Sequence, residues 1–137
     1  MSFEDCLRKG LIRRSETAGE KVEQSLLLAD RFLKSARKNL EMEEYEVCEI
    51  ISYNAIFHYG RALIFRKGYV ERSHACLFLA ILKLYPDCRT LAEKADKIRI
   101  ERHGLQYAGF SATGDSASFV LDFAEEFGRA ARKILEK

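Results

Sequence analysis

The segment from Arg102 to Tyr107, RHGLQY, holds the residues whose types and spacing could do chemistry together. Its arginine interrupts an apolar stripe that steps by three and four residues along a predicted helix. The apolar members of this stripe are Leu91, Ala95, Ile98 and Leu105. A guanidinium keeps its charge at ordinary pH, so on an inward stripe it must meet a carboxylate, carbonyls, water or an anionic ligand. Two interpretations stay open. Arg102 lies solvated or paired at a bundle rim, or it binds phosphate with His103 and Tyr107.

The remaining candidate residues carry weaker signals. His58 lies on an apolar stripe of the predicted central helix, where a histidine is more often a hydrogen-bonded core residue than a ligand. Tyr53 on the same helix and His74 at the start of the next one are weak candidates when taken singly. There is no Gly-rich phosphate loop, carboxylate pair at defined spacing or nucleophile elbow, so we expect no cofactor.

The four cysteines, Cys6, Cys48, Cys76 and Cys88, are scattered and form no C-x-x-C pair. The three histidines lie in different segments, so we expect no metal site. Most of the cysteines fall inside helical patterns, where the thiol usually packs as a small apolar group. We therefore expect reduced, packed thiols.

The elements that must position these residues are helices. Apolar residues recur at helical spacing over residues 17–42, and residues 44–67 are apolar nearly all round, which predicts a central helix. Gly60 in that helix indicates close packing by a neighbour. Residues 3–14 read as a short amphipathic piece.

Three further helices follow along the chain. Ser73 is a good N-cap for the next helix, Pro86 ends it, and Asp87 can cap the one after, which we expect to end near Gly104. Residues 109–118 are rich in small residues and predict a loop, and a last helix begins near residue 115 or 116. Short loops make sequential helices antiparallel. The prediction is an all-α, up-and-down bundle of four main helices plus a C-terminal helix.

The length, composition and net charge of the chain indicate how many domains it has and which classes of protein it fits. With 137 residues, 47% hydrophobic and one proline, the chain is expected to form one domain over residues 1–137, with a short amphipathic segment at 1–15. The net charge of +2 does not by itself indicate a nucleic-acid binder. No apolar run is long enough for a membrane span, and the N-terminus MSFEDCLRKG lacks the pattern of a signal peptide. We expect a cytoplasmic protein without a membrane partner.

The run from Ser52 to Leu63, SYNAIFHYGRAL, followed by Lys67-Gly68 and then Arg72-Ser73-His74, resembles the HEPN domain. It is similar in particular to small prokaryotic members whose second long helix reads A-Y-Y-A-x-F-H-x-A-R-A-L. The RHGLQY segment matches the later R-x-x-A-D-Y motif of that group at Arg102 and Tyr107. The likeness extends from about residue 25 to residue 135.

This resemblance implies a helical bundle that dimerises, with Arg102 near the dimer groove. Many members are metal-independent ribonucleases that use an Arg-x(4–6)-His motif, and others work with a minimal nucleotidyltransferase as a toxin–antitoxin pair or bind nucleotides. Tyr107 stands where the nuclease members carry histidine. Tyrosine, with a pKa of about 10, is a poorer base near neutral pH.

Three hypotheses follow from these residues. The first is a homodimeric HEPN accessory protein that binds nucleotide or RNA phosphate through Arg102 and Tyr107, with Arg61 and His58 as further ligand-binding residues and a nucleotidyltransferase as partner. The second is a ribonuclease in which Arg102 holds the scissile phosphate and His103 or Tyr107 transfers the proton. The third is a non-catalytic helical interaction module, in which Arg102 forms an interface salt bridge.

Overall fold

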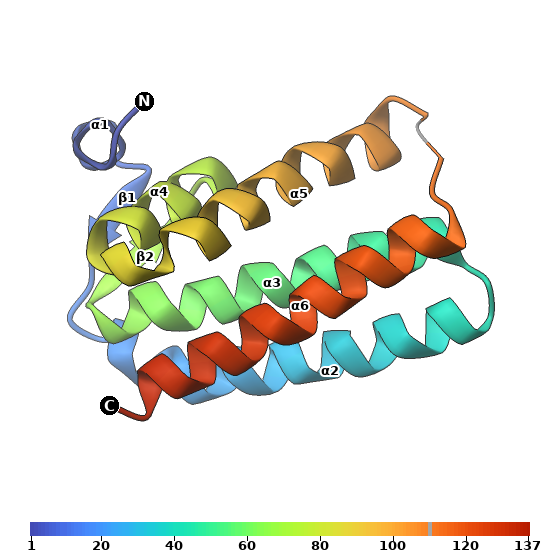
Figure 1. Ribbon diagram of the computed structural model, residues 1–137. Helices are drawn as coiled ribbons and strands as arrows, with labels where there is room; N and C mark the ends of the chain where they lie inside the picture. The colour runs from blue at the N-terminus through green and yellow to red at the C-terminus, as the bar shows by residue number, and fades with distance from the viewer. Residues whose placement is uncertain (110) are drawn as a thin grey trace.

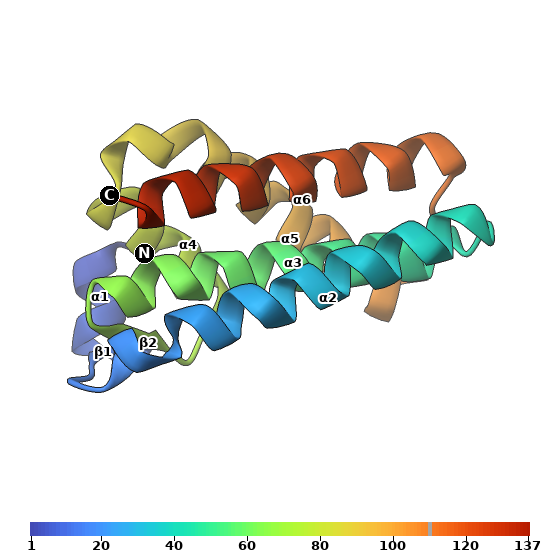
Figure 2. The same cartoon turned by 90° about the horizontal axis from the view of Figure 1, so that it is seen from below.

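Six helices and one small sheet make up the computed structural model, which describes residues 1–109 and 111–137 (Figure 1). In chain order the elements are α1 Phe3–Arg8, β1 Ile12–Arg14, a 3₁₀ turn Ala18–Lys21, α2 Val22–Glu41, α3 Tyr45–Arg66, β2 Tyr69–Glu71, α4 His74–Leu84, a 3₁₀ turn Pro86–Cys88, α5 Arg89–Tyr107 and α6 Gly114–Leu135. The bundle of α2 to α6 confirms the all-α prediction. The sheet, α1 and α4 gather at the end where α2 begins and α6 finishes (Figures 1 and 2).

α3 lies at the centre because it has no polar face to turn to solvent along most of its length. It packs against α2, α4, α5 and α6. Gly60 lets α4 approach closely, since a Cβ there would lie 3.1 Å from Cδ1 of Ile81. The predicted close packing at Gly60 is confirmed.

A polar network joins α2, α3 and α6 on the face of α3 that α6 covers. The hydroxyl of Tyr59, whose side chain is 2% exposed, donates to Oδ1 of Asp30 at 2.5 Å. Arg132 of α6 pairs with the other oxygen of the same carboxylate. The ring of Tyr59 passes directly against Gly128 of α6, where only a glycine leaves room for it.

The N-terminal residues differ from the single amphipathic piece that was predicted. α1 stops after Arg8, the chain turns at Gly10 with φ of 71°, and residues 12–14 form β1. β1 pairs antiparallel with β2, with Ile12 opposite Glu71. Strands of three residues are too short to show alternation in the sequence, so this sheet could not be predicted.

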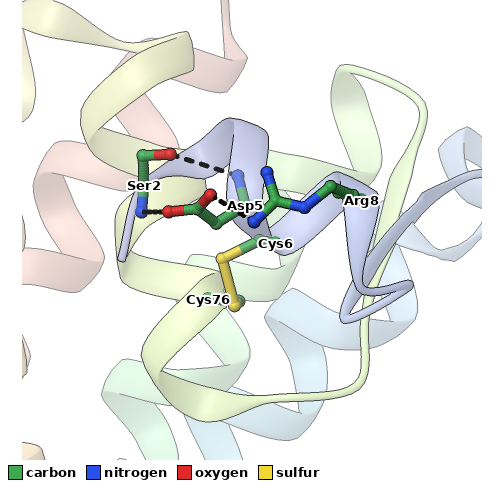
Figure 3. Close-up of polar contacts among 5 residues, drawn as sticks. All are labelled: Ser2, Asp5, Cys6, Arg8 and Cys76. Atoms are coloured by element: carbon green, nitrogen blue, oxygen red, sulfur yellow. Dashed lines mark hydrogen bonds and ion pairs between the residues drawn. A yellow bond between two sulfur atoms is a disulfide. The ribbon is translucent and has the colours of Figure 1, made fainter.

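The expectation of four reduced cysteines is wrong for two of them. Cys6 of α1 and Cys76 in the first turn of α4 form a disulfide, with their Cα atoms 5.9 Å apart (Figure 3). A capping box between Ser2 and Asp5 starts α1, and Arg8 pairs with Asp5 at 2.7 Å. The two cysteines are 70 positions apart in the sequence, and nothing in it signals this pairing. Cys48 and Cys88 are free and buried, as expected.

Three helix boundaries also differ from the predictions. α5 continues through Gly104, which is buried and helical, and ends at Tyr107. Asp87 lies within the 3₁₀ turn and does not cap α5. α6 begins at residue 114 because the Thr113 hydroxyl accepts from the backbone N–H of residue 116. Within the predicted loop 109–118, Phe110 lies outside the described residues.

Candidate functional site

α5 divides the RHGLQY segment between two of its faces. Arg102 and Gln106 share one face, where Nη1 of the arginine donates to Oε1 of the glutamine at 2.6 Å. His103 and Tyr107 share the neighbouring face, with ring centroids 4.8 Å apart. Both of these rings are exposed, Tyr107 by 69%. Since residues one step apart on a helix point about 100° apart, Arg102 and the His103–Tyr107 pair face different surroundings.

Arg102 turns toward α3. Its guanidinium carbon lies 4.7 Å from the ring centroid of Tyr53, which is fully buried. Its Nε is buried and has no hydrogen-bond partner among the described residues. A half-buried guanidinium with an unsatisfied donor is costly unless an acceptor completes it.

Tyr53 and His74 form a hydrogen-bonded pair beneath Arg102. The hydroxyl of Tyr53 and Nδ1 of His74 are 2.6 Å apart, and their rings stack with centroids 5.8 Å apart. Ser73 fixes this position, because its side chain caps the first turn of α4, in which His74 lies.

Burial and nearby cations keep this pair neutral. Burial, followed by the positive charges of Arg102, Arg99 and Arg61, lowers the pKa of His74. Burial also raises the pKa of Tyr53, despite Arg102 close by. Near neutral pH the imidazole of His74 is therefore uncharged, and the phenol of Tyr53 keeps its proton.

Of the three arginines around His74, Arg102 is the one with no carboxylate partner in the described part of the chain. Nε of Arg99 binds Oδ1 of Asp96 at 2.7 Å. Nε of Arg61 binds Oε1 of Glu71 at 2.8 Å. Arg102 is thus the one of these three arginines whose charge no described carboxylate offsets.

The other two predicted ligand-binding residues lie elsewhere along α3. His58 and Arg61 line a cavity between the start of α2 and the second half of α3. The ring of His58 stacks on Phe32, with centroids 5.5 Å apart, and meets the edge of Phe57. Burial, followed by the charges of Arg61 and His74, lowers the pKa of His58 to about 4.

Tyr53 and His74 are the residues that sequence reasoning left out of the site. Each was a weak candidate because 21 positions separate them and nothing in their spacing pairs them. The family resemblance was the signal that could have found them. Tyr53 lies in the helix segment that resembles the family, and His74 lies in the Ser-His pair that follows Lys67-Gly68. A helical reading of each segment alone could not bring them together.

The helical bundle places the chain in a known class of domain. The HEPN domain model matches residues 22–134, which is most of the chain. The chain therefore belongs to the HEPN domain family, whose membership indicates a role connected with nucleotides or RNA. No match is found among curated proteins. In the described part of the chain, every helix is too short or too polar to cross a membrane.

Proposed function

We propose that this HEPN protein binds the phosphate of a nucleotide or of RNA at Arg102, as a homodimer and in association with a nucleotidyltransferase partner. The observation that carries the proposal is the state of Arg102 itself. Its guanidinium is held over Tyr53 without a carboxylate partner among the described residues, and its buried Nε has no acceptor there. A positioned fork of N–H donors matches the oxygens of a phosphate.

The surroundings of Arg102 suit a nucleotide more than a free ion. Its own segment adds Tyr107 and His103, two exposed rings that can stack on a base. His74 below it carries no negative charge and so does not compete with a phosphate for Arg102 as a carboxylate would. The proposal that Arg102 and Tyr107 form an R-x-x-A-D-Y-like motif rests on the sequence resemblance.

The dimer and the partner protein rest on family membership and on the exposed apolar side chains. HEPN domains commonly form dimers. Ile100 on α5 is 58% exposed and Leu27 on α2 is 54% exposed, so each could contact a second copy of the chain. A homodimer would cover such residues, and its mass in solution would be twice the 15.8 kDa of one chain.

Arg102→Ala tests the phosphate site. We expect the affinity for a short fluorescent single-stranded RNA, measured by anisotropy, to fall about tenfold or more, as befits the loss of a charge-assisted contact. The slope of log affinity against log salt concentration should fall by roughly one, because one phosphate contact is lost. The matched control is Arg89→Ala, which removes an exposed arginine of the same helix that pairs only with Glu93 in the described structure.

The outcomes separate the hypotheses. Equal loss in Arg102→Ala and Arg89→Ala would mean a general charge effect and would refute a site at Arg102. If Arg102→Ala weakens only the dimer and leaves RNA and nucleotide binding intact, the chain is an interaction module. Co-purification with a nucleotidyltransferase would support the proposed partner.

A second candidate function, metal-independent ribonuclease, is favoured by the pairing of His74 with Tyr53 beside Arg102. A neutral imidazole can accept the proton of a ribose 2′-hydroxyl as that oxygen attacks the phosphorus. The bond to the 5′-oxygen then breaks and this oxygen takes a proton from water, which gives a 2′,3′-cyclic phosphate and a 5′-hydroxyl end. His103 and Tyr107 remain the alternative proton-transfer residues of the motif segment.

Incubating the purified protein with RNA in excess chelator tests this activity. Cleavage that is lost in His74→Gln points to the Tyr53–His74 pair, whereas loss in His103→Ala or Tyr107→Phe points to the His103–Tyr107 pair. Intact RNA after incubation with the folded dimer would exclude the ribonuclease and leave the binding function.

A further inference from the structure

A cavity of about 250 Å³ lies between the start of α2 and the second half of α3, apart from Arg102. Its polar lining includes Lys21 just before α2, Gln24 on α2, and His58 and Arg61 on α3, while Phe65 supplies an apolar wall. The ring of Phe57 packs against both His58 and His74, so it stands between this cavity and the cluster under Arg102.

Arg61 is held in place with its terminal nitrogens unused by other described residues. Its Nε binds Glu71 on β2 at 2.8 Å, and its guanidinium carbon lies 4.9 Å from the ring centroid of Phe65. The ring of Phe57 is 5.8 Å away from the same carbon. An arginine fixed through Nε and by neighbouring rings presents a ready fork to an anion, at little further cost in side-chain entropy.

Lys21 adds a second cation at the same cavity. Its ammonium lies 5.9 Å from the ring centroid of Phe65, and no described carboxylate lies within ion-pair distance of it. Glu71 offsets the charge of Arg61, so Lys21 leaves the cavity with a net positive charge. An anion that enters between the two would meet three donors from the lysine as well as the arginine fork.

His58 supplies the third observation. Its Nδ1 is buried and has no hydrogen-bond partner among the described residues. The backbone carbonyl of the same residue accepts from the hydroxyl of Ser25 on α2 at 2.7 Å, which fixes α2 against α3 at the cavity. A buried unsatisfied ring nitrogen is expected to find a partner, such as a ligand group or a water held with it.

We propose that this cavity between α2 and α3 is a second binding site, specific for a terminal phosphate group, held by Lys21 and Arg61 with His58 at the inner wall. It is smaller than the roughly 300–1,000 Å³ of pockets that enclose whole drug-sized ligands, so it holds a phosphate and part of the attached group. A terminal phosphate carries more charge than a phosphodiester, and two cations at one small cavity favour it. A mononucleotide and a phosphorylated RNA end share this chemistry.

The experiment titrates the full chain with inorganic phosphate, adenosine 5′-monophosphate and adenosine, and follows the backbone amide signals of residues 21 and 58 by nuclear magnetic resonance. We expect both phosphate compounds to shift these signals at millimolar concentrations and adenosine not to shift them. Lys21→Ala should weaken the binding by about tenfold, since it removes one charge-assisted contact. Arg61→Lys keeps the charge but loses the fork, and should weaken it as well.

The matched control is Lys38→Ala, which removes an exposed lysine from the far end of α2 and should leave the shifts unchanged. The proposal is overturned if adenosine shifts the signals as adenosine 5′-monophosphate does, or if millimolar phosphate shifts nothing. It is also overturned if Arg102→Ala abolishes the shifts and Lys21→Ala does not, because the phosphate then belongs to the Arg102 site. The function proposed for Arg102 is judged separately by RNA affinity, so either site can fail alone.

Two RNA probes identify the source of the phosphate. A short RNA with a 5′-phosphate that binds more tightly than both its 5′-hydroxyl form and adenosine 5′-monophosphate would assign the cavity to an RNA end. Equal affinity for the phosphorylated RNA and the mononucleotide would mean that the cavity recognises one phosphorylated nucleotide and that the rest of the RNA adds nothing. Both results support a terminal-phosphate site.

Discussion

Gly128→Ala should destabilise the bundle, although alanine is the better helix former. A Cβ at this position would lie 2.7 Å from Cε2 and Cζ of Tyr59 and 3.1 Å from its hydroxyl oxygen. Carbon atoms prefer to be about 3.5–4.0 Å apart, so the clash is about 1 Å deep. The ring cannot retreat freely, because it is 2% exposed and its hydroxyl is bonded to Asp30.

The expected change in the free energy of unfolding is the balance of one gain and two alternative costs. Replacing glycine within a helix gains about 1 kcal/mol. Overpacking a filled core costs about 1–3 kcal/mol. If the ring moves instead, the hydrogen bond to the Asp30 carboxylate weakens, and a bond of that type contributes about 1.5–3 kcal/mol. We expect the free energy of unfolding to fall by about 1–2 kcal/mol, and the Tm to fall by roughly 3–10 °C.

Gly60→Ala is the matched control, because it has the same chemistry and also lies in a long helix. Its Cβ would meet Cδ1 of Ile81 at 3.1 Å and Cδ2 of Leu77 at 3.3 Å, which are the ends of flexible side chains. These can shift by a few tenths of an ångström, so the variant should stay within about 1 kcal/mol of the natural protein. Urea unfolding followed by far-ultraviolet circular dichroism measures both variants. A Gly128→Ala protein as stable as the natural one would refute the assignment of this contact.

Two further predictions concern the disulfide and His58. Replacing both Cys6 and Cys76 by serine should lower the unfolding free energy by about 4 kcal/mol, since the bridge closes a loop across a sequence separation of 70; equal urea midpoints for the two proteins would contradict this. The pKa of His58 is about 4 in the folded protein and ordinarily 6.5. As the pH falls from 6.5 to 4, His58 therefore binds a proton in the unfolded chain but not in the folded one, which favours unfolding. Stability should therefore decline across that window and level off below it. His58→Gln should flatten the decline in urea midpoints between pH 7 and pH 5, leaving the part due to His74, whose pKa is lowered in the same direction.

The helices, and the place of Arg102 on the inward face of one of them, could be predicted because apolar residues recur at helical spacing. The stripe of Leu91, Ala95 and Ile98 fixes the inward face of α5, and Arg102 falls where that face reaches Tyr53. Helical spacing also separates Arg102 from His103, as the structure has it.

The partners of these residues could not be predicted, because they come from distant elements. Nothing local pairs Tyr53 with His74, or Cys6 with Cys76. Lys21 and Arg61 meet at one cavity only because α2 and α3 pack together, and Glu71 reaches Arg61 only because β2 follows α3 immediately. Such contacts depend on the tertiary arrangement, which periodicity within one segment does not encode.

The small sheet and the residues before α2 help to build the cavity between α2 and α3. The family match begins at Val22, yet Lys21 precedes it, and β1 supports the strand whose Glu71 holds Arg61. A chain trimmed to residues 22–134 would lose one cation of the cavity together with that support, and it would also lose the disulfide and the core residues Phe3, Ile12 and Ala18. The cavity is thus assembled partly by residues that lie outside the family match. Exchanging residues 1–21 would therefore change both the cavity and the stability of the bundle, because this segment supplies Lys21, Cys6 of the disulfide and buried core side chains.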